Sequence, residues 1–128
     1  MSGKCLVDTN VIIRLLQSDE RSIELFDQAD SICISAIVAG ELFYGAQKSS
    51  RRQENIDIFS DFLSQYELIE IDFQIAQVYG EIKAQLIGDG INIPENDLWI
   101  AATAKFYHFT LISFDAHFSK IDGLNVLS

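Results

Sequence analysis

The chain has 128 residues, 48% of them hydrophobic and only one a proline, which excludes a disordered protein and permits a hydrophobic core. A single domain over residues 1–128 is therefore expected. The net charge of −10 argues against a general nucleic-acid binder, which normally carries an excess of Lys and Arg, but it permits an enzyme whose acids hold metal ions.

Short β-rich runs alternate along the chain with apolar residues at helical spacing. In chain order, the pattern predicts a strand over 4–7, helices over 9–16 and 20–29, a strand over 31–35, helices over 36–47 and 50–64, a strand over 67–71, helices over 73–87 and 97–107, and strands over 109–113 and 125–127. Ser50 and Asp72 are the expected caps of the helices that follow them. The alternation predicts an α/β fold in which helices cover both faces of a mainly parallel sheet of four to five strands.

No targeting or membrane segment is expected. The first residues, MSGKCLVD, are not typical of a signal peptide, because the apolar run is short and meets Asp8 at once. The longest mostly apolar segment, ISAIVAGELFYGA, is too short to span a bilayer and carries Glu41 in its middle. We therefore expect a soluble cytoplasmic protein with no membrane partner.

Glu41 is the only charged side chain between Ala36 and Ala46. Burying a lone carboxylate is unfavourable, so Glu41 should pair with a cation or a metal ion. The alternative is an exposed Glu on a surface helix. Gly40 and Gly45 weaken the same helix, and close approach by another segment would explain why they are tolerated.

Three further acids stand next to the ends of predicted elements. Asp8 follows the first strand, at the carboxyl end where ligands bind to parallel sheets, or it caps the next helix. Asn96 is the expected N-cap of the helix over 97–107, so Asp97 falls in the first turn, where the alternative is that it only complements the helix dipole. Asp115 lies beyond the fourth strand, and its alternative is a turn residue or the cap of a short helix ending near Phe118.

Four acids from separate elements are therefore expected to meet at the carboxyl edge of one sheet: Asp8, Glu41, Asp97 and Asp115. Like charges placed together repel strongly unless divalent cations neutralise them. Ligands that offer only oxygen favour Mg²⁺ or Mn²⁺ over zinc. Such ions commonly activate water and stabilise the charge that builds on a phosphoryl group.

The cysteines and histidines do not suggest another metal site. Cys5 and Cys33 lie in predicted strands without CxxC spacing, so we interpret them as small buried hydrophobes rather than as a disulfide or as metal ligands. His108 and His117 are nine residues apart with no Cys nearby, which is not typical of a structural zinc site.

Four motifs, in this order, resemble the PIN domain, and more closely the VapC-type toxins of bacterial toxin–antitoxin pairs: LVDTNVII, GELFYG, NDLWIAATA and LISFDAHFSKIDGLNV. The resemblance covers essentially the whole chain. It implies a three-layer α/β/α fold and a Mg²⁺- or Mn²⁺-dependent endoribonuclease that leaves 5′-phosphate and 3′-hydroxyl ends. The partners it implies are an RNA substrate, a second copy of the chain in a homodimer, and a cognate antitoxin whose tail lies across the active-site groove.

The resemblance also implies roles for individual residues. Asp8 and Asp97 match the family's metal ligands, Glu41 would orient or deprotonate the attacking water, and Asp115 would help to hold a second metal ion or the water shell of the first. Small polar residues expected to support the site are Thr9, Asn10 and Ser113.

One basic cluster stands out in the sequence QKSSRRQEN: Lys48, Arg51 and Arg52. The cluster either contacts RNA phosphates or is a solvated loop and helix start.

Two other readings are weighed against the ribonuclease. A haloacid-dehalogenase-like phosphatase also begins with a strand that ends in Asp, but it needs a second Asp two residues later, where this chain has Asn10. A non-enzymatic acidic α/β module that binds a basic partner fits the charge, but it explains neither Glu41 in an apolar helix nor the order of the acids. A metal titration followed by heat unfolding separates these classes, because a binding module should not respond to Mn²⁺.

Overall fold

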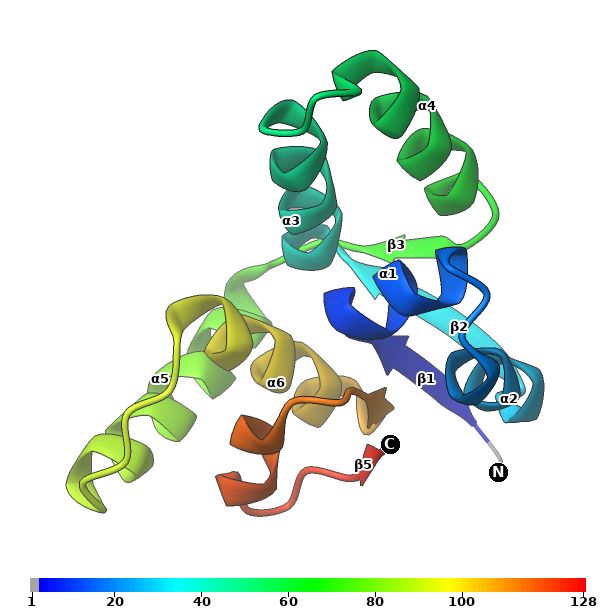
Figure 1. Cartoon of the computed structure of the whole chain (residues 1–128). Coiled ribbons are helices and arrows are strands. Elements are labelled where there is room, and N and C mark those ends of the chain that lie inside the picture. Colours follow the sequence, from blue (N-terminus) through cyan, green and yellow to red (C-terminus); the bar gives the residue numbers. More distant parts are fainter. Residues whose placement is uncertain (1–2) are drawn as a thin grey trace.

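The computed structural model describes residues 3–128, which contain a parallel sheet of five strands (Figure 1). In chain order the strands are β1 (Lys4–Val7), β2 (Ser31–Ser35), β3 (Glu67–Ile69), β4 (Thr110–Ile112) and β5 (Val126–Leu127). Their order across the sheet is β3-β2-β1-β4-β5, and every neighbouring pair is parallel. The first strand of the chain therefore lies at the centre of the sheet.

Helices connect and flank these strands. Within residues 3–128 they are α1 (Thr9–Leu16), α2 (Glu20–Gln28), α3 (Ala36–Gln47), α4 (Arg52–Leu63), α5 (Phe73–Gly88), α6 (Glu95–Tyr107) and the 3-10 helix η1 (Ala116–Lys120). Figure 1 shows α3 beside α4, and α5 against α6. The helix-flanked parallel sheet confirms the predicted three-layer α/β/α class. No helix in the described part of the chain combines the length and the apolarity that crossing a membrane requires.

β1 is the buried centre of the core. Its residues Cys5, Leu6 and Val7 are all 0% exposed, and so is Cys33 on β2, which confirms the interpretation of both cysteines as buried hydrophobes. Continuous apolar strands of this kind suit a sheet covered on both faces. The register pairs Val7 with Ile112 of β4, so the residues that follow these two strands leave the sheet side by side.

The start of α4 differs from the prediction. The N-cap residue is Arg51, whose side chain makes no capping hydrogen bond, so the prediction that Ser50 caps this helix is wrong. The hydroxyl of Ser49 instead organises the turn: it donates to the Ala46 carbonyl at 2.7 Å and accepts from the Asn55 amide at 3.0 Å. One serine thus links the end of α3 to the first turn of α4.

The start of α6 also differs. The helix begins directly after Pro94, which is its extended N-cap residue, so the prediction that Asn96 is the cap is wrong and Asn96 lies in the first turn. A contact with α5 accompanies this earlier start, because Lys83 Nζ lies 2.6 Å from a carboxylate oxygen of Glu95, to which Tyr79 also donates a hydrogen bond. Asp97 nevertheless stays in the first turn, as predicted.

Candidate active site

Asp8 both caps a helix and occupies the centre of the sheet's carboxyl edge. Its Oδ1 accepts from the Thr9 backbone N–H at 2.8 Å, which caps α1, and its Oδ2 accepts from the Ser113 hydroxyl at 2.7 Å. The backbone N–H of Asp8 continues the β1–β4 pairing by donating to the Ile112 carbonyl at 2.9 Å. The two alternatives left open by the sequence are therefore compatible, since one carboxylate serves the cap and faces the site.

The environment of Asp8 disfavours its charged form. The residue is only 5% exposed, and burial raises its pKa to about 6. The hydrogen bonds from Ser113 and Thr9 oppose this shift, whereas the negative charges of Asp97 and Glu41 add to it. At neutral pH this carboxylate is ionised at a cost to the folded state, and a positive partner would offset that cost.

Glu41 faces the same edge from α3. It is half-buried, and its Oε1 accepts a hydrogen bond from the Thr9 hydroxyl at 2.8 Å. Within residues 3–128 it forms no ion pair with Lys or Arg, so the expected cation partner is absent there and its partner is a hydroxyl. Thr9 thus fixes one carboxylate oxygen of Glu41 and leaves the other available.

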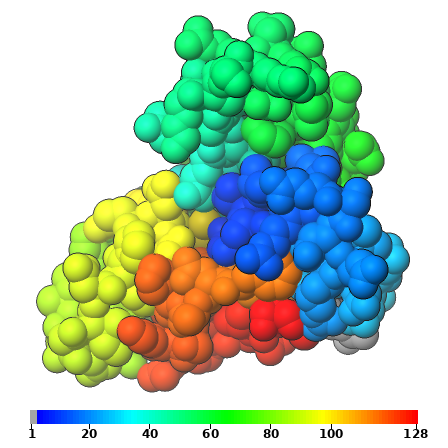
Figure 2. Space-filling model, viewed as in Figure 1, coloured from blue at the N-terminus to red at the C-terminus, as the bar shows by residue number. Residues whose placement is uncertain are grey.

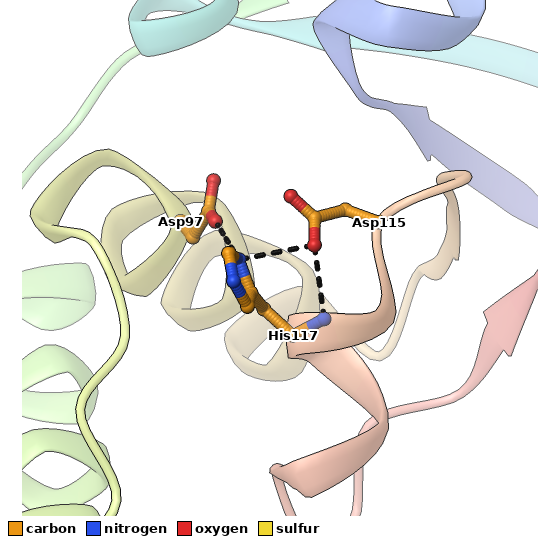
Figure 3. Close-up of side chains that lie close together, drawn as sticks. All are labelled: Asp97, Asp115 and His117. Carbon is orange, nitrogen blue, oxygen red and sulfur yellow. Dashed lines mark hydrogen bonds and ion pairs between the residues drawn. The ribbon is translucent and has the colours of Figure 1, made fainter.

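Asp97 and Asp115 meet around a histidine (Figure 3). Asp115 caps η1 by accepting from the His117 backbone N–H at 3.0 Å. The His117 Nδ1 atom lies 3.0 Å from an oxygen of Asp97 and 3.0 Å from an oxygen of Asp115. Ligand atoms of these three side chains lie within 4.8 Å of one another, a spacing that suits a shared metal ion. Burial raises the pKa of Asp97, and the nearby charges of Asp115 and Glu41 raise it further, while His117 lowers it.

His117 was not predicted as a member of the acid cluster, because its spacing from His108 indicated no zinc site and only carboxylates were expected to meet there. The available signal was local: a residue two positions after a capping Asp has its backbone N–H on that carboxylate. Its imidazole then lies beside the same acid. The contact with Asp97, twenty residues earlier, has no local signal.

The predicted supporting residues hold the strand ends together. The Asn10 side chain accepts from the Phe114 backbone N–H at 3.3 Å, and the Ser113 hydroxyl accepts from the Asp115 backbone N–H at 3.0 Å. Asp72 lies apart from them and caps α5 by accepting from the Ile75 N–H at 3.0 Å, as predicted.

The four acids fit a divalent cation. The negative charges of Asp97 and Glu41 raise the pKa of Asp8, and those of Asp115 and Glu41 raise the pKa of Asp97. The four carboxylates therefore interact electrostatically. In the described part of the chain, the ion pairs found bring no Lys or Arg to any of them. The tightest group is Asp97, Asp115 and His117, while Asp8 and Glu41 lie outside it. Hard oxygen donors in excess, with one imidazole, suit Mg²⁺ or Mn²⁺.

A groove of about 650 Å³ opens beside the acids, between α3 and the start of α6. Figure 2 shows the surface hollowed where these two segments, coloured teal and yellow, approach each other. The groove is lined by Thr9, Ala36, Ile37, Gly40, Glu41, Tyr44, Gly45, Lys48 and Asn96. A Cβ atom added at Gly40 or Gly45 would meet no atom within 4 Å, so the expected close approach of another segment is wrong. Both glycines instead form part of the groove wall.

The structure separates the three members of the basic cluster. Lys48 lies on the groove, with its Nζ 4.9 Å from the centre of the Tyr44 ring. Arg51 lies 3.7 Å from a carboxylate oxygen of Glu54, and the Arg52 Nε donates to the Gln47 carbonyl at 3.0 Å. Only Lys48 lines the same groove as Glu41.

Comparisons with known proteins point to one family. The family model described as "PIN domain" matches residues 5–124. "Ribonuclease VapC2" of Haemophilus influenzae is 38% identical, with 86% of this chain and 85% of the relative covered. "tRNA(fMet)-specific endonuclease VapC" of Salmonella typhimurium is 31% identical, with 96% of each covered.

Solved structures are similar over nearly the whole chain. DNA-bound VapBC from Salmonella typhimurium gives a TM-score of 0.90 at 29% identity, with 98% of each chain covered. VapBC2 from Rickettsia felis, bound to a DNA fragment from its promoter, gives a TM-score of 0.86 at 30% identity, again with 98% of each chain covered.

Proposed function

The chain belongs to the PIN domain family, and from this premise we propose that it is a metal-dependent endoribonuclease that hydrolyses RNA phosphodiester bonds. One observation carries the proposal: buried and half-buried carboxylates gather at the carboxyl edge of the sheet with no Lys or Arg partner among residues 3–128. A purely structural role does not explain such a cluster, because it would destabilise the fold.

Mg²⁺ or Mn²⁺ is the proposed cofactor. The residues that would hold it are Asp8 and Asp97, with help from Asp115. When bound, the ion supplies a Lewis acid that stabilises the negative charge developing on the phosphoryl oxygens. His117 contacts two of these acids and would orient them.

The chain's own groups provide the remaining chemistry. Thr9 donates to one oxygen of Glu41 and leaves the other oxygen available, so that Glu41 could orient an attacking water and accept its proton. The Thr9 N–H and the Ser113 hydroxyl hold the two oxygens of Asp8 in place. Expected products are a 5′-phosphate and a 3′-hydroxyl.

We further propose that the chain is the toxin of a toxin–antitoxin pair, restrained by a cognate antitoxin, and that it forms a homodimer in the cytoplasm. The similar solved structures are VapBC complexes, which supports a protein partner of this kind. An acidic site also suits a partner that offers a basic side chain.

The direct test is RNA cleavage by the purified protein in millimolar Mg²⁺ or Mn²⁺. We expect cleavage products that disappear when EDTA is added, and fragment ends that carry 5′-phosphate and 3′-hydroxyl groups. A phosphatase would instead release inorganic phosphate from p-nitrophenyl phosphate. A non-enzymatic module would leave RNA intact, and Mn²⁺ would not change its melting temperature. The outcome expected for the phosphatase or the outcome expected for the module would rule out the proposal.

The basic cluster allows a separate prediction about RNA binding. Lys48→Ala should flatten the plot of log affinity against log salt concentration by about 0.7, the slope that one contact with a single-stranded phosphate contributes. A matched variant with Arg51→Ala and Arg52→Ala should change the slope less, because both side chains have partners within the protein. Binding of a labelled single-stranded RNA, measured by fluorescence anisotropy in EDTA at several salt concentrations, gives both slopes. Equal slopes for the parent chain and both variants would show that the cluster is a solvated surface that does not contact RNA phosphates.

A further inference from the structure

We propose that the groove beside Glu41 is a binding subsite for one unpaired nucleotide of the RNA, whose base stacks on Tyr44 and whose phosphate contacts Lys48. The inference rests on the proposed ribonuclease function, because it places the nucleotide next to the bond that is cleaved. It begins from three features of the groove wall along α3 and its C-cap: an exposed aromatic ring, a lysine for which no carboxylate partner is found within residues 3–128, and two glycines.

Tyr44 provides the stacking surface. It is 66% exposed although it is a large ring, and it lies three residues after Glu41, on the same side of α3. Aromatic side chains that line a groove bind unpaired bases by stacking, whatever the base.

Lys48 provides the charge. Its Nζ lies 4.9 Å from the Tyr44 ring centre, and none of the ion pairs found in residues 3–128 includes it. Lys48 is the C-cap of α3 and lies seven positions after Glu41, a rise of about 10 Å along the helix axis. A phosphate at Lys48 is therefore a neighbour of the phosphate that is attacked at Glu41. The same strand of RNA can reach both.

The glycines provide the space. Gly45 lies one turn beyond Glu41 and Gly40 one turn before Tyr44, and both line the groove. Glycine in the middle of a helix is less favourable than alanine, yet a Cβ here would meet no protein atom within 4 Å. Packing of the folded chain therefore does not require either glycine. Their effect is to leave room for a ligand backbone close to α3.

RNA is favoured over a protein segment as the occupant because the groove wall itself carries Glu41. A substrate that reaches Glu41 can continue along α3 past Tyr44, since both side chains line one groove. An unpaired nucleotide brings both a base for the ring and a phosphate for the lysine. Recognition of single-stranded RNA commonly combines these two contacts.

The test measures kcat and KM separately, with a random-sequence pool of single-stranded RNA oligonucleotides in Mn²⁺. Tyr44→Ala should raise KM about tenfold, within the range that one stacked base contributes, while kcat changes little. Tyr44→Phe keeps the ring and should restore the KM of the parent chain. Because Phe lacks only the hydroxyl, this rescue distinguishes stacking from a hydrogen bond.

The glycine variants provide a readout that loss of folding cannot imitate. Gly45→Ala should raise the melting temperature by a few degrees and yet raise KM, because the new methyl group favours the helix but fills the groove. Gly80→Ala is the matched control: Gly80 also lies inside a helix with no atom within 4 Å of an added Cβ, but it does not line this groove. It should raise the melting temperature and leave KM unchanged.

The outcomes distinguish the two proposals. If the parent chain cleaves the RNA pool but Tyr44→Ala and Gly45→Ala keep its KM, the subsite is wrong and the ribonuclease function stands; the groove then serves a protein partner. If the parent chain does not cleave RNA in Mg²⁺ or Mn²⁺, the proposed function fails and the subsite fails with it. A raised KM for both variants, rescued by Tyr44→Phe, supports the subsite.

Discussion

Replacing Asp8, Glu41 or Asp97 by its amide is expected to lower RNA cleavage by about two orders of magnitude or more, even at saturating Mg²⁺. That decrease corresponds to about 3 kcal/mol of lost transition-state stabilisation. Each amide keeps the size of the side chain but removes a negative charge that would bind the metal ion or accept a proton. Asn is also a good N-cap residue, so Asp8→Asn should preserve the start of α1.

The matched control for these variants is Asp72→Asn. Asp72 also follows a strand and caps a helix through its carboxylate, but it lies outside the acid cluster. We expect its cleavage rate to remain close to that of the parent chain. Single-turnover cleavage of an end-labelled RNA measures the rates of the four variants and of the parent chain. A loss for Asp72→Asn as large as that for Asp8→Asn would show that the site has been assigned to the wrong acids.

In the absence of metal, Asp8→Asn is expected to increase the free energy of unfolding at pH 7, by up to about 3 kcal/mol. Asp8 is 5% exposed, and burial raises its pKa from 3.8 to about 6. At pH 7 the folded parent chain must therefore hold a buried, ionised carboxylate near Glu41 and Asp97, whereas the amide carries no charge.

The pH dependence of this difference has a definite sign. Because the folded-state pKa of Asp8 is higher than the unfolded value, the folded state binds the proton first as the pH falls. The destabilisation by Asp8 is therefore complete above about pH 6 and disappears toward about pH 4, where the parent and Asp8→Asn should converge. Taking the difference between the two proteins also cancels the contributions of other acids to the pH dependence of stability. Asp19, whose pKa is lowered by hydrogen bonds from Ser22, is one such acid.

Urea unfolding in EDTA between about pH 4 and pH 8 measures this difference. Mn²⁺ at about 1,000 times its Kd should reverse the order of stability at pH 7, because binding then adds about 4.1 kcal/mol to the folded parent, more than the variant gains by losing the charge. The variant lacks the Asp8 carboxylate that would bind the ion, so it loses most of this stabilisation. If the difference in free energy of unfolding is constant with pH and does not respond to Mn²⁺, Asp8 is not a ligand of the metal ion.

Much of the fold was predictable because its signals are local. An apolar run of strand length predicted β1, and helical spacing of apolar residues predicted α3 and α5. The helices between successive strands predicted the parallel sheet, since parallel neighbours need crossover connections. The cap positions at Ser50 and Asn96 were predicted wrongly, because several polar residues stand near each helix start and contacts with other elements decide among them.

The sequence by itself predicted four acids as candidates for one site, although each also had an ordinary alternative role. Asp8, Glu41, Asp97 and Asp115 stood at element ends or in apolar surroundings, and the tertiary structure places all of them at one edge of the sheet. Capping alone did not distinguish them, since Asp8, Asp72 and Asp115 all cap helices.

Only the tertiary structure decided which capping acid is buried among other charges. Asp8 follows the central strand β1, while Asp72 follows β3 at the edge of the sheet, and strand order is not encoded in any local pattern. The register of β1 on β4 then brings the Ser113 hydroxyl to Asp8 across 105 residues of sequence. The contact of His117 with Asp97 arises in the same way, because it depends on how η1 packs against α6. These two contacts, between Asp8 and Ser113 and between His117 and Asp97, depend on how whole helices and strands pack. The spacing of residues along the chain does not determine that packing.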